Sequence, residues 1–310
     1  MLRAGFCGSG RFAAACLRLL SGQFKPAWVV TNTPKTSGRG LQLHDTPVSI
    51  AAQELEIPCF TTDRLSADTE RTEWIVSDAP DIIFVIDFGH LIKEPLLSLP
   101  KYGCINLHPS KLPLYRGSAP LQRAIMDGLK TTAVSVFKLD SGMDTGDLLS
   151  QPGVEISEND TYDSLLERCA EAGCREMLRL IFEVKPDNWK FKPQPQDGFS
   201  LAPKIDKSEG RIDWNKSAFA CGCLVRALSN APGVFCFNGD KRLRIFKASV
   251  IKSQKTAEPG EIIAIENGEP VIACGENALK LETVQPDSKK QQSAADWLRG
   301  ARLSVGDRLQ

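Results

Sequence analysis

Hydrophobic residues near the start of the chain form short continuous runs that alternate with stretches of helical spacing. The run Leu2–Phe6 leads into a glycine-rich turn at residues 8–10, and apolar residues then recur at helical intervals from Phe12 to Leu20. The segment 81–86 is a nearly continuous apolar run, which is typical of a strand buried on both faces of a parallel sheet. A strand, a glycine turn and a helix in this order predict an α/β domain with a doubly wound, Rossmann-like, mostly parallel sheet.

The same patterns predict the other elements of this domain. Strands are expected at residues 27–30, 58–60, 104–107 and 132–137, extended chain at 148–156, and helices at 48–55, 71–76, 119–127 and 161–184. The first turn does not complete a dinucleotide-binding motif, because Ala13 occupies the third glycine position and no acidic residue follows the second strand. We therefore do not expect NAD binding.

One connection in this domain is unusually long. Residues 34–47 join a strand to a helix and are rich in Gly, Pro and Ser, whereas such connections usually have about two to six residues. We predict a mobile surface loop here, and long loops on such scaffolds often hold ligands. A tolerated surface insertion explains the segment equally well.

The hydrophobic pattern changes after residue 184. Residues 185–207 contain four prolines and five lysines without a long apolar run, as expected for a basic linker. Short strands separated by turns follow, with helices expected at 217–227 and 293–299, and this pattern predicts a small, OB-like β-barrel. The predicted organisation is a catalytic domain at 1–184, a linker at 185–207 and a C-terminal β-barrel domain at 208–310.

Composition and charge narrow the possible functions. The chain has 310 residues with 38 basic and 38 acidic side chains, but residues 201–310 carry 17 basic against 13 acidic ones. This mildly basic part could assist in binding a polyanion, although scattered surface charge explains it as well. No window of 18 consecutive apolar residues exists, and the ten cysteines contain no Cys-x-x-Cys pair. We expect a cytoplasmic protein with reduced cysteines, no membrane contact and no metal site.

Three polar residues are the candidates for catalysis. Asn106 and His108 are two residues apart in a predicted strand and therefore share one face at its carboxyl end, where open parallel sheets bind their ligands. Asp144 follows the neighbouring strand in a glycine-rich turn, and we expect two neighbouring strand ends to bring the three side chains together. A carboxylate beside a histidine can orient the ring or accept a proton, and an asparagine can donate to a developing oxyanion.

A purely structural role is the alternative explanation for His108. A single histidine at a strand end is more often a hydrogen-bonded structural residue than a catalyst, and only the three residue types together favour catalysis. No Ser or Cys occupies the third position of this face as a nucleophile, which favours direct attack by the substrate. A metal site would need further ligands that the spacing does not supply.

A family resemblance follows from the motifs around these residues. They are Asn106–Ser110, Ser110–Pro113, Arg116–Pro120 and Asp140–Gly146, with Gly38–Gly40, Ala202–Lys204, Arg211–Trp214, Pro232–Gly233, Lys247–Ser249, Pro259–Gly260 and Gly306–Leu309. Over essentially its whole length the chain resembles the folate-dependent formyltransferases. The resemblance implies 10-formyltetrahydrofolate as formyl donor, and the insertion loop and C-terminal barrel imply the α-amine of methionyl initiator tRNA as acceptor, in a monomeric enzyme.

The resemblance also implies roles for individual residues. Asn106 and His108 would polarise the formyl oxygen, and Asp144 would take the amine proton and orient His108. The folate would be bound by Phe88, Gly89, Ser110, Lys111, Leu112, Pro113 and Asp140. The tRNA would be bound by Lys35, Arg39, Lys204 and Lys207.

Three other functions use the same features. A sugar-nucleotide N-formyltransferase shares the Asn-His-Asp group, but it needs neither the Gly38–Gly40 insertion nor a basic linker. Hydrolysis of the formyl donor would need only water as acceptor. A non-catalytic RNA-binding protein on this scaffold would have no need for an intact Asn106, His108 and Asp144.

Overall fold

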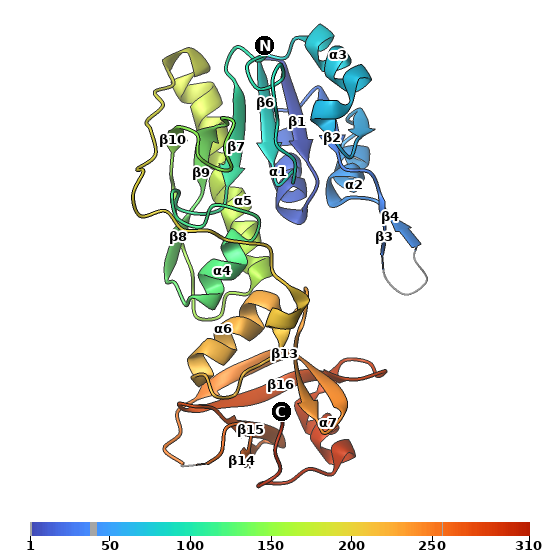
Figure 1. Cartoon of the computed structure of the whole chain (residues 1–310), viewed down its shortest axis with the longest axis vertical. Coiled ribbons are helices and arrows are strands. Elements are labelled where there is room, and N and C mark those ends of the chain that lie inside the picture. Colours follow the sequence, from blue (N-terminus) through green and yellow to red (C-terminus); the bar gives the residue numbers. More distant parts are fainter. Residues whose placement is uncertain (1, 38–41, 256) are drawn as a thin grey trace. The chain divides into compact units, whose positions relative to one another are not determined.

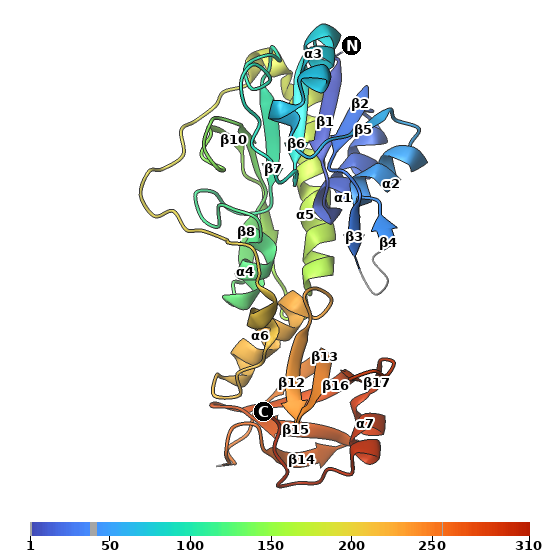
Figure 2. The same cartoon turned by 45° about the vertical axis from the view of Figure 1, so that its right-hand side comes forward.

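The chain forms two compact units in a computed structural model that describes residues 2–37, 42–255 and 257–310 (Figures 1 and 2). The N-terminal unit comprises the chain up to Pro120, Thr131–Glu155 and Asp163–Pro203. The C-terminal unit comprises Leu121–Lys130, Ile156–Tyr162 and Lys204–Gln310. Most of the predicted linker thus belongs to the N-terminal unit, and two short inner segments belong to the C-terminal one.

The N-terminal unit is built on a seven-stranded sheet of order β10-β9-β7-β6-β1-β2-β5. Its strands are β1 (Ala4–Gly8), β2 (Trp28–Thr31), β5 (Cys59–Thr61), β6 (Ile82–Ile86), β7 (Cys104–His108), β9 (Ser135–Lys138) and β10 (Leu148–Ser150). The five strands from β7 to β5 are parallel, whereas β9 runs antiparallel to both of its neighbours. The predicted mostly parallel α/β sheet is confirmed, with β1 fully buried and β6 likewise.

Helices cover both faces of this sheet. On one face, α1 (Arg11–Ser21) joins α2 (Pro47–Glu54) through an Arg18–Glu54 ion pair and meets α5 (Tyr162–Arg179) where the Cys174 thiol approaches the Cys16 carbonyl. On the other face, α3 (Thr69–Asp78) buries Ile75 in a cluster with residues of β1, β2 and β6. These helices form where the sequence predicts them, because their apolar residues recur with a helical period.

Two predicted stretches are more structured than expected. The long connection 34–47 contains a hairpin of β3 (Lys35–Ser37) and β4 (Gln42–His44), whose tip lies outside the described residues. The predicted strand 132–137 is interrupted at Val134, so that β8 (Thr131–Ala133) pairs with β11 (Gly153–Glu155) and only β9 joins the main sheet. Backbone pairing of this kind leaves no separate mark in the hydrophobic pattern.

The C-terminal unit is an antiparallel β domain with helices at its start and end. Its main sheet has the order β12-β13-β16-β15-β14, and β17 pairs with β16. The elements are α4 (Pro120–Met126), α6 (Ala218–Leu228), β12 (Val234–Asn238), β13 (Lys241–Ile251), β14 (Ile262–Glu266), β15 (Glu269–Ala273), β16 (Ala278–Pro286), β17 (Gln292–Ser293) and α7 (Ala294–Ala301). Asn267 and Gly268 both have positive φ and form the hairpin turn that their sequence predicts.

None of the helices among the described residues has the length and apolar character needed to cross a membrane. All ten cysteines are free, and nine of them are buried.

Candidate functional site

Strand β7 places Asn106 and His108 on one face of the sheet. Side chains alternate between the two faces of a strand, so Cys104 lies on the same face as Asn106 and His108. Cys104 belongs to the core cluster on the α3 side of the sheet, together with Ile92 and Leu96. Leu107 points the other way, toward α5, where it lies close to Gly173. His108 is buried and Asn106 is half-buried. The expected pairing of these two side chains on one face is therefore present.

The structure brings Asp144 to His108 by a different route from the one that the sequence suggests. Because β9 is antiparallel to β7, Ser135 at its start lies beside His108, and Lys138 at its end lies beside Ile105. The end of β9 therefore does not lie beside the end of β7, contrary to the expectation that two neighbouring strand ends bring these residues together. Instead, the loop 139–147 returns along β7, and an oxygen of Asp144 lies 3.8 Å from Nδ1 of His108.

The hydrogen bonds of His108 fix the position of its ring hydrogen. Nε2 lies 2.9 Å from the carbonyl oxygen of Tyr115, and a carbonyl can only accept a hydrogen bond. Nε2 therefore carries a hydrogen, and Nδ1 is the nitrogen that faces the Asp144 carboxylate. The 3.8 Å between Nδ1 of His108 and Oδ2 of Asp144 is longer than a hydrogen bond, so the two groups are not hydrogen-bonded to each other.

Asp144 is held by a backbone amide on one side only. Its Oδ2 accepts a hydrogen bond of 2.8 Å from the amide of Gly117, whereas Oδ1 has no hydrogen-bond partner among the residues that the structure describes. Gly117 has a φ of +124°, and a Cβ there would lie 2.7 Å from the carbonyl oxygen of Ala202, so only glycine fits. The carboxylate is thus oriented and still has a free oxygen for a ligand.

Sequence reasoning missed the residues that support this pair. Gly117 lies in the Arg116–Pro120 motif and Tyr115 directly precedes that motif, but nothing in their residue types marks the two contacts. Gln194 is a buried side chain of the predicted linker and contacts the Asp144 loop. Its only signal in the sequence is its place between two prolines, which restrict the backbone around it.

The residues expected to bind folate lie directly after His108 and on two neighbouring segments. Ser110 and Leu112 are buried, Lys111 is exposed and Pro113 is half-buried. The Ser110 hydroxyl donates to the Leu114 carbonyl, and the Leu112 amide donates to Ser135, so these bonds shape the segment. On the neighbouring segments, Phe88 is buried and Gly89 exposed, while Asp140 accepts from Gly142 and Thr145 within the Asp144 loop.

Asp87 lies at the start of helix α1, beside this site. Helix α1 has no side-chain cap and no acid in its first turn, and the amides of Phe12 and Ala13 favour the anion of the nearby Asp87 carboxylate. Gly10 leaves room for it, since a Cβ at that position would overlap the carboxylate. Part of Asp87 reaches solvent, yet the carboxylate is surrounded by protein atoms, which raises the pKa of Asp87 to about 6, although the two amides favour its anion.

The residues expected to contact tRNA are on both units. Lys35 is exposed on β3 of the N-terminal unit, and Lys204 and Lys207 are exposed at the start of the main C-terminal segment. Arg39 lies outside the described residues. The sequence reasoning missed a set of arginine–phenylalanine contacts in the C-terminal unit, namely Arg242 with Phe235, Arg211 with Phe237 and Arg244 with Phe246.

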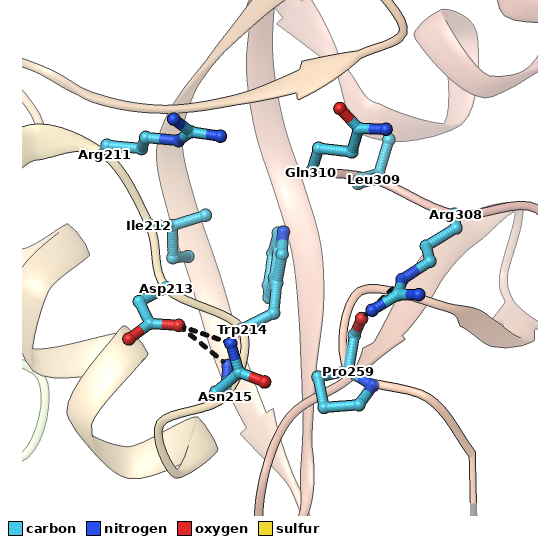
Figure 3. A pocket seen from close by; sticks show the side chains of 9 residues that line it. All are labelled: Arg211, Ile212, Asp213, Trp214, Asn215, Pro259, Arg308, Leu309 and Gln310. Carbon is cyan, nitrogen blue, oxygen red and sulfur yellow. Dashed lines mark hydrogen bonds between the residues drawn. The ribbon is translucent and has the colours of Figure 1, made fainter.

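A cavity of about 580 Å³ lies within the C-terminal unit (Figure 3). It is lined by Arg211, Ile212, Asp213, Trp214, Asn215, Pro259, Arg308, Leu309 and Gln310. The Trp214 indole nitrogen is buried and has no hydrogen-bond partner among the described residues. The cavity includes none of the residues predicted for catalysis or for folate binding, so it is separate from the site on β7.

Comparisons with known proteins identify the family of both parts of the chain. Residues 6–181 match the profile of the formyl transferase family, and residues 204–302 match that of the formyl transferase C-terminal domain. The methionyl-tRNA formyltransferase of Rickettsia bellii (strain RML369-C) is 35% identical over 98% of this chain and 99% of its own length. The enzyme of the same name from Rickettsia rickettsii (strain Iowa) is 35% identical over 96% of each chain.

Solved structures share the fold. An N-formyltransferase from Helicobacter canadensis, in complex with folinic acid and dTDP-3-aminofucose, superposes with a TM-score of 0.66 at 18% identity over 91% of this chain and 99% of its own. Methionyl-tRNA formyltransferase from Clostridium thermocellum gives 0.57 at 17% identity, over 80% of this chain and 93% of its own. The chain therefore belongs to the formyl transferase family, and its full-length relatives place it with the methionyl-tRNA formyltransferases within that family.

Proposed function

We propose that the protein transfers the formyl group of 10-formyltetrahydrofolate to the α-amine of methionyl initiator tRNA. One observation supports this proposal most directly: an oxygen of the Asp144 carboxylate lies 3.8 Å from the His108 ring, Asn106 shares a face of β7 with His108, and hydrogen-bonding groups there are unused. Oδ1 of Asp144 and the Asn106 side chain have no hydrogen-bond partner among the described residues. A base and two oxygen-binding groups are what acyl transfer to an amine requires.

The residues fit the donor at the reacting group. The donor supplies a formyl carbon whose bond to folate N10 breaks as the carbon–nitrogen bond to the amine forms. Asn106 donates to the formyl oxygen as negative charge develops there, and a protonated Nδ1 of His108 does the same. Nε2 stays bound to the Tyr115 carbonyl and keeps the ring in place.

Asp144 moves the proton in this proposal. Its free oxygen, Oδ1, accepts the proton that the attacking amine loses, while the Gly117 amide holds Oδ2. The same carboxylate stabilises the charged form of His108 across 3.8 Å. The proton then passes to folate N10, so that charge balances on both sides of the reaction.

Two features support a macromolecular acceptor. The β3–β4 hairpin carries the exposed Lys35, and the C-terminal unit carries exposed lysines at its start together with the arginine–phenylalanine contacts. Exposed cations beside aromatic rings suit the phosphates and bases of RNA. The relatives of nearly equal length also share the name of the tRNA enzyme.

One assay tests the proposal. Purified protein is given 10-formyltetrahydrofolate with charged initiator tRNA, with an amino-sugar nucleotide, or with neither acceptor. We expect formyl-methionyl-tRNA in the first mixture and no loss of the formyl donor in the others. Turnover of the amino sugar without formylation of the tRNA would show that the acceptor is wrong, and loss of the donor without any acceptor would indicate a hydrolase.

A further inference from the structure

The last segment of the N-terminal unit lies along that unit as a strap, here defined as residues 192–202. Lys192 exchanges two backbone hydrogen bonds of 2.8 Å with Leu148 at one end. At the other end, the Arg116 amide donates to the Ser200 carbonyl at 2.9 Å, and the Ala202 amide donates to the Arg116 carbonyl at 2.7 Å. The composition predicts only a basic connector here, but two backbone attachments make the strap part of the catalytic unit.

Gln194 is the buried polar side chain of the strap, with 8% of its surface exposed. Its amide nitrogen donates to the carbonyl oxygens of Asp144, at 2.9 Å, and of Gly146, at 2.7 Å. Its oxygen accepts a hydrogen bond of 2.7 Å from the guanidinium of Arg116. Both amide hydrogens and the oxygen are therefore used, as expected for a buried carboxamide.

These three bonds join the two segments that hold the reacting side chains. Arg116 lies between Tyr115, whose carbonyl accepts from His108, and Gly117, whose amide donates to Asp144. The other two bonds end on the loop that carries Asp144 itself. Gln194 thus connects the support of the histidine to the backbone of the carboxylate.

The conformation of Asp144 explains why such a connection is needed. Asp144 has a φ of +55°, in the left-handed region that residues other than glycine rarely adopt. Such conformations persist where the surroundings hold them, and they are frequent at functional sites. The bond from Gln194 to the Asp144 carbonyl holds the peptide that follows the strained residue.

We propose that Gln194 is a positioning residue for formyl transfer. It sets the distance between the Asp144 carboxylate and His108 without touching a substrate, and this role rests on the function proposed above. A carboxylate displaced by about 1 Å can lose about 100-fold in rate. Loss of Gln194 should therefore lower kcat and leave both substrate affinities nearly unchanged.

Two substitutions separate the contacts of Gln194. Gln194→Met keeps the length of the side chain and removes all three hydrogen bonds. Gln194→Glu keeps an acceptor for Arg116 but places a carboxylate oxygen against the carbonyls of Asp144 and Gly146. In formylation of methionyl-tRNA, we expect both variants to lower kcat about 10- to 100-fold while each KM changes less than about threefold.

Gln285→Met is the matched control. Gln285 also accepts from an arginine, Arg244, and donates to a backbone carbonyl, that of Lys289, but it lies in the C-terminal unit. Its kcat should equal that of the unsubstituted protein. Thermal unfolding of every variant shows whether the fold is intact, and Gln194→Glu carries the test if Gln194→Met does not fold.

A double-mutant cycle with Asp144→Asn distinguishes positioning from a general structural role. If Gln194 acts through Asp144, adding Gln194→Met to Asp144→Asn should cost less than about twofold further in kcat. If Gln194→Met lowers kcat by the same factor with and without Asp144→Asn, the proposal is overturned. A folded Gln194→Glu variant with normal kcat would also overturn it. If the unsubstituted protein does not formylate methionyl-tRNA, the proposed function fails first, and that result is distinct from either of these.

Discussion

The candidate catalytic pair of the N-terminal unit and the arginine–phenylalanine contacts of the C-terminal unit use charge in different ways. In the N-terminal unit, the side chains of His108 and Asp144 expose 7% and 15% of their surface, and a backbone group holds each of them. In the C-terminal unit, the cations lie over aromatic rings on partly exposed strands, as with the Arg242 guanidinium at 3.7 Å from the centre of the Phe235 ring. One arrangement fixes atoms, and the other presents charge to solvent.

This difference predicts different consequences of substitution. A buried, oriented pair contributes through geometry, so a small displacement should alter kcat strongly. An exposed cation contributes through a screened, long-range field, so its loss should alter KM slightly and depend on salt. Kinetics should therefore separate the units more clearly than stability does.

The largest effect is expected for Asp144→Asn. An asparagine can still accept from the Gly117 amide, so the loop should keep its shape, but it can neither take a proton nor stabilise a charged His108. We expect kcat to fall about 10³-fold or more with little change in unfolding temperature. The control is Asp147→Asn, the same change at an exposed position of the loop 139–147, and it should keep normal kcat. A small effect of Asp144→Asn on kcat would show that Asp144 has no part in the mechanism.

A smaller effect is expected in the C-terminal unit for the double variant Lys204→Ala/Lys207→Ala. Loss of two phosphate contacts should raise the KM for tRNA about 5- to 10-fold and flatten its salt dependence by about 1.4 to 1.8 in log–log slope. The paired control is Lys289→Ala/Lys290→Ala, two exposed lysines of the same unit. If this control raises KM equally, the tRNA contact is spread over the unit and is not specific to residues 204 and 207.

The sequence predicts the catalytic unit better than it predicts how its parts meet. Continuous apolar runs indicate buried parallel strands, and the alternation of side chains places Asn106 with His108. The direction of β9 is not encoded in such a pattern, so the route of Asp144 to His108 was predicted wrongly. The contact of Gln194 with Asp144 joins residues 50 positions apart, and it depends on a path of the linker that composition does not reveal.

Acid should weaken the hydrogen bonds of Asp78 in the N-terminal unit more than those of Glu282 in the C-terminal unit. Asp78 accepts from Arg3 and, at 2.8 Å, from the buried Trp28 indole, and the bond from Arg3 is the main reason why the pKa of Asp78 is lowered. In the C-terminal unit, burial works to raise the pKa of Glu282, but bonds from Lys247 and Ser249 lower it overall. The Asp78 side chain is 8% exposed and that of Glu282 is 21% exposed.

The sign of the effect follows from these lowered pKa values. A carboxyl group whose folded pKa lies below its unfolded value stabilises the fold above the unfolded pKa, near 4, and loses this contribution as the pH falls through the folded pKa. At pH 7, Asp78→Asn should therefore cost about 1–3 kcal/mol, because Trp28 and Arg3 lose a charged acceptor, and Glu282→Gln should cost less than about 1 kcal/mol. Thermal unfolding from pH 7 to pH 3 should show the Asp78→Asn and unsubstituted curves converging below about pH 4. The opposite result would be a Glu282→Gln variant that loses more stability at pH 7 than Asp78→Asn, with this loss disappearing in acid. The more exposed carboxylate would then contribute more, and the contrast between the two units would not extend to their stability.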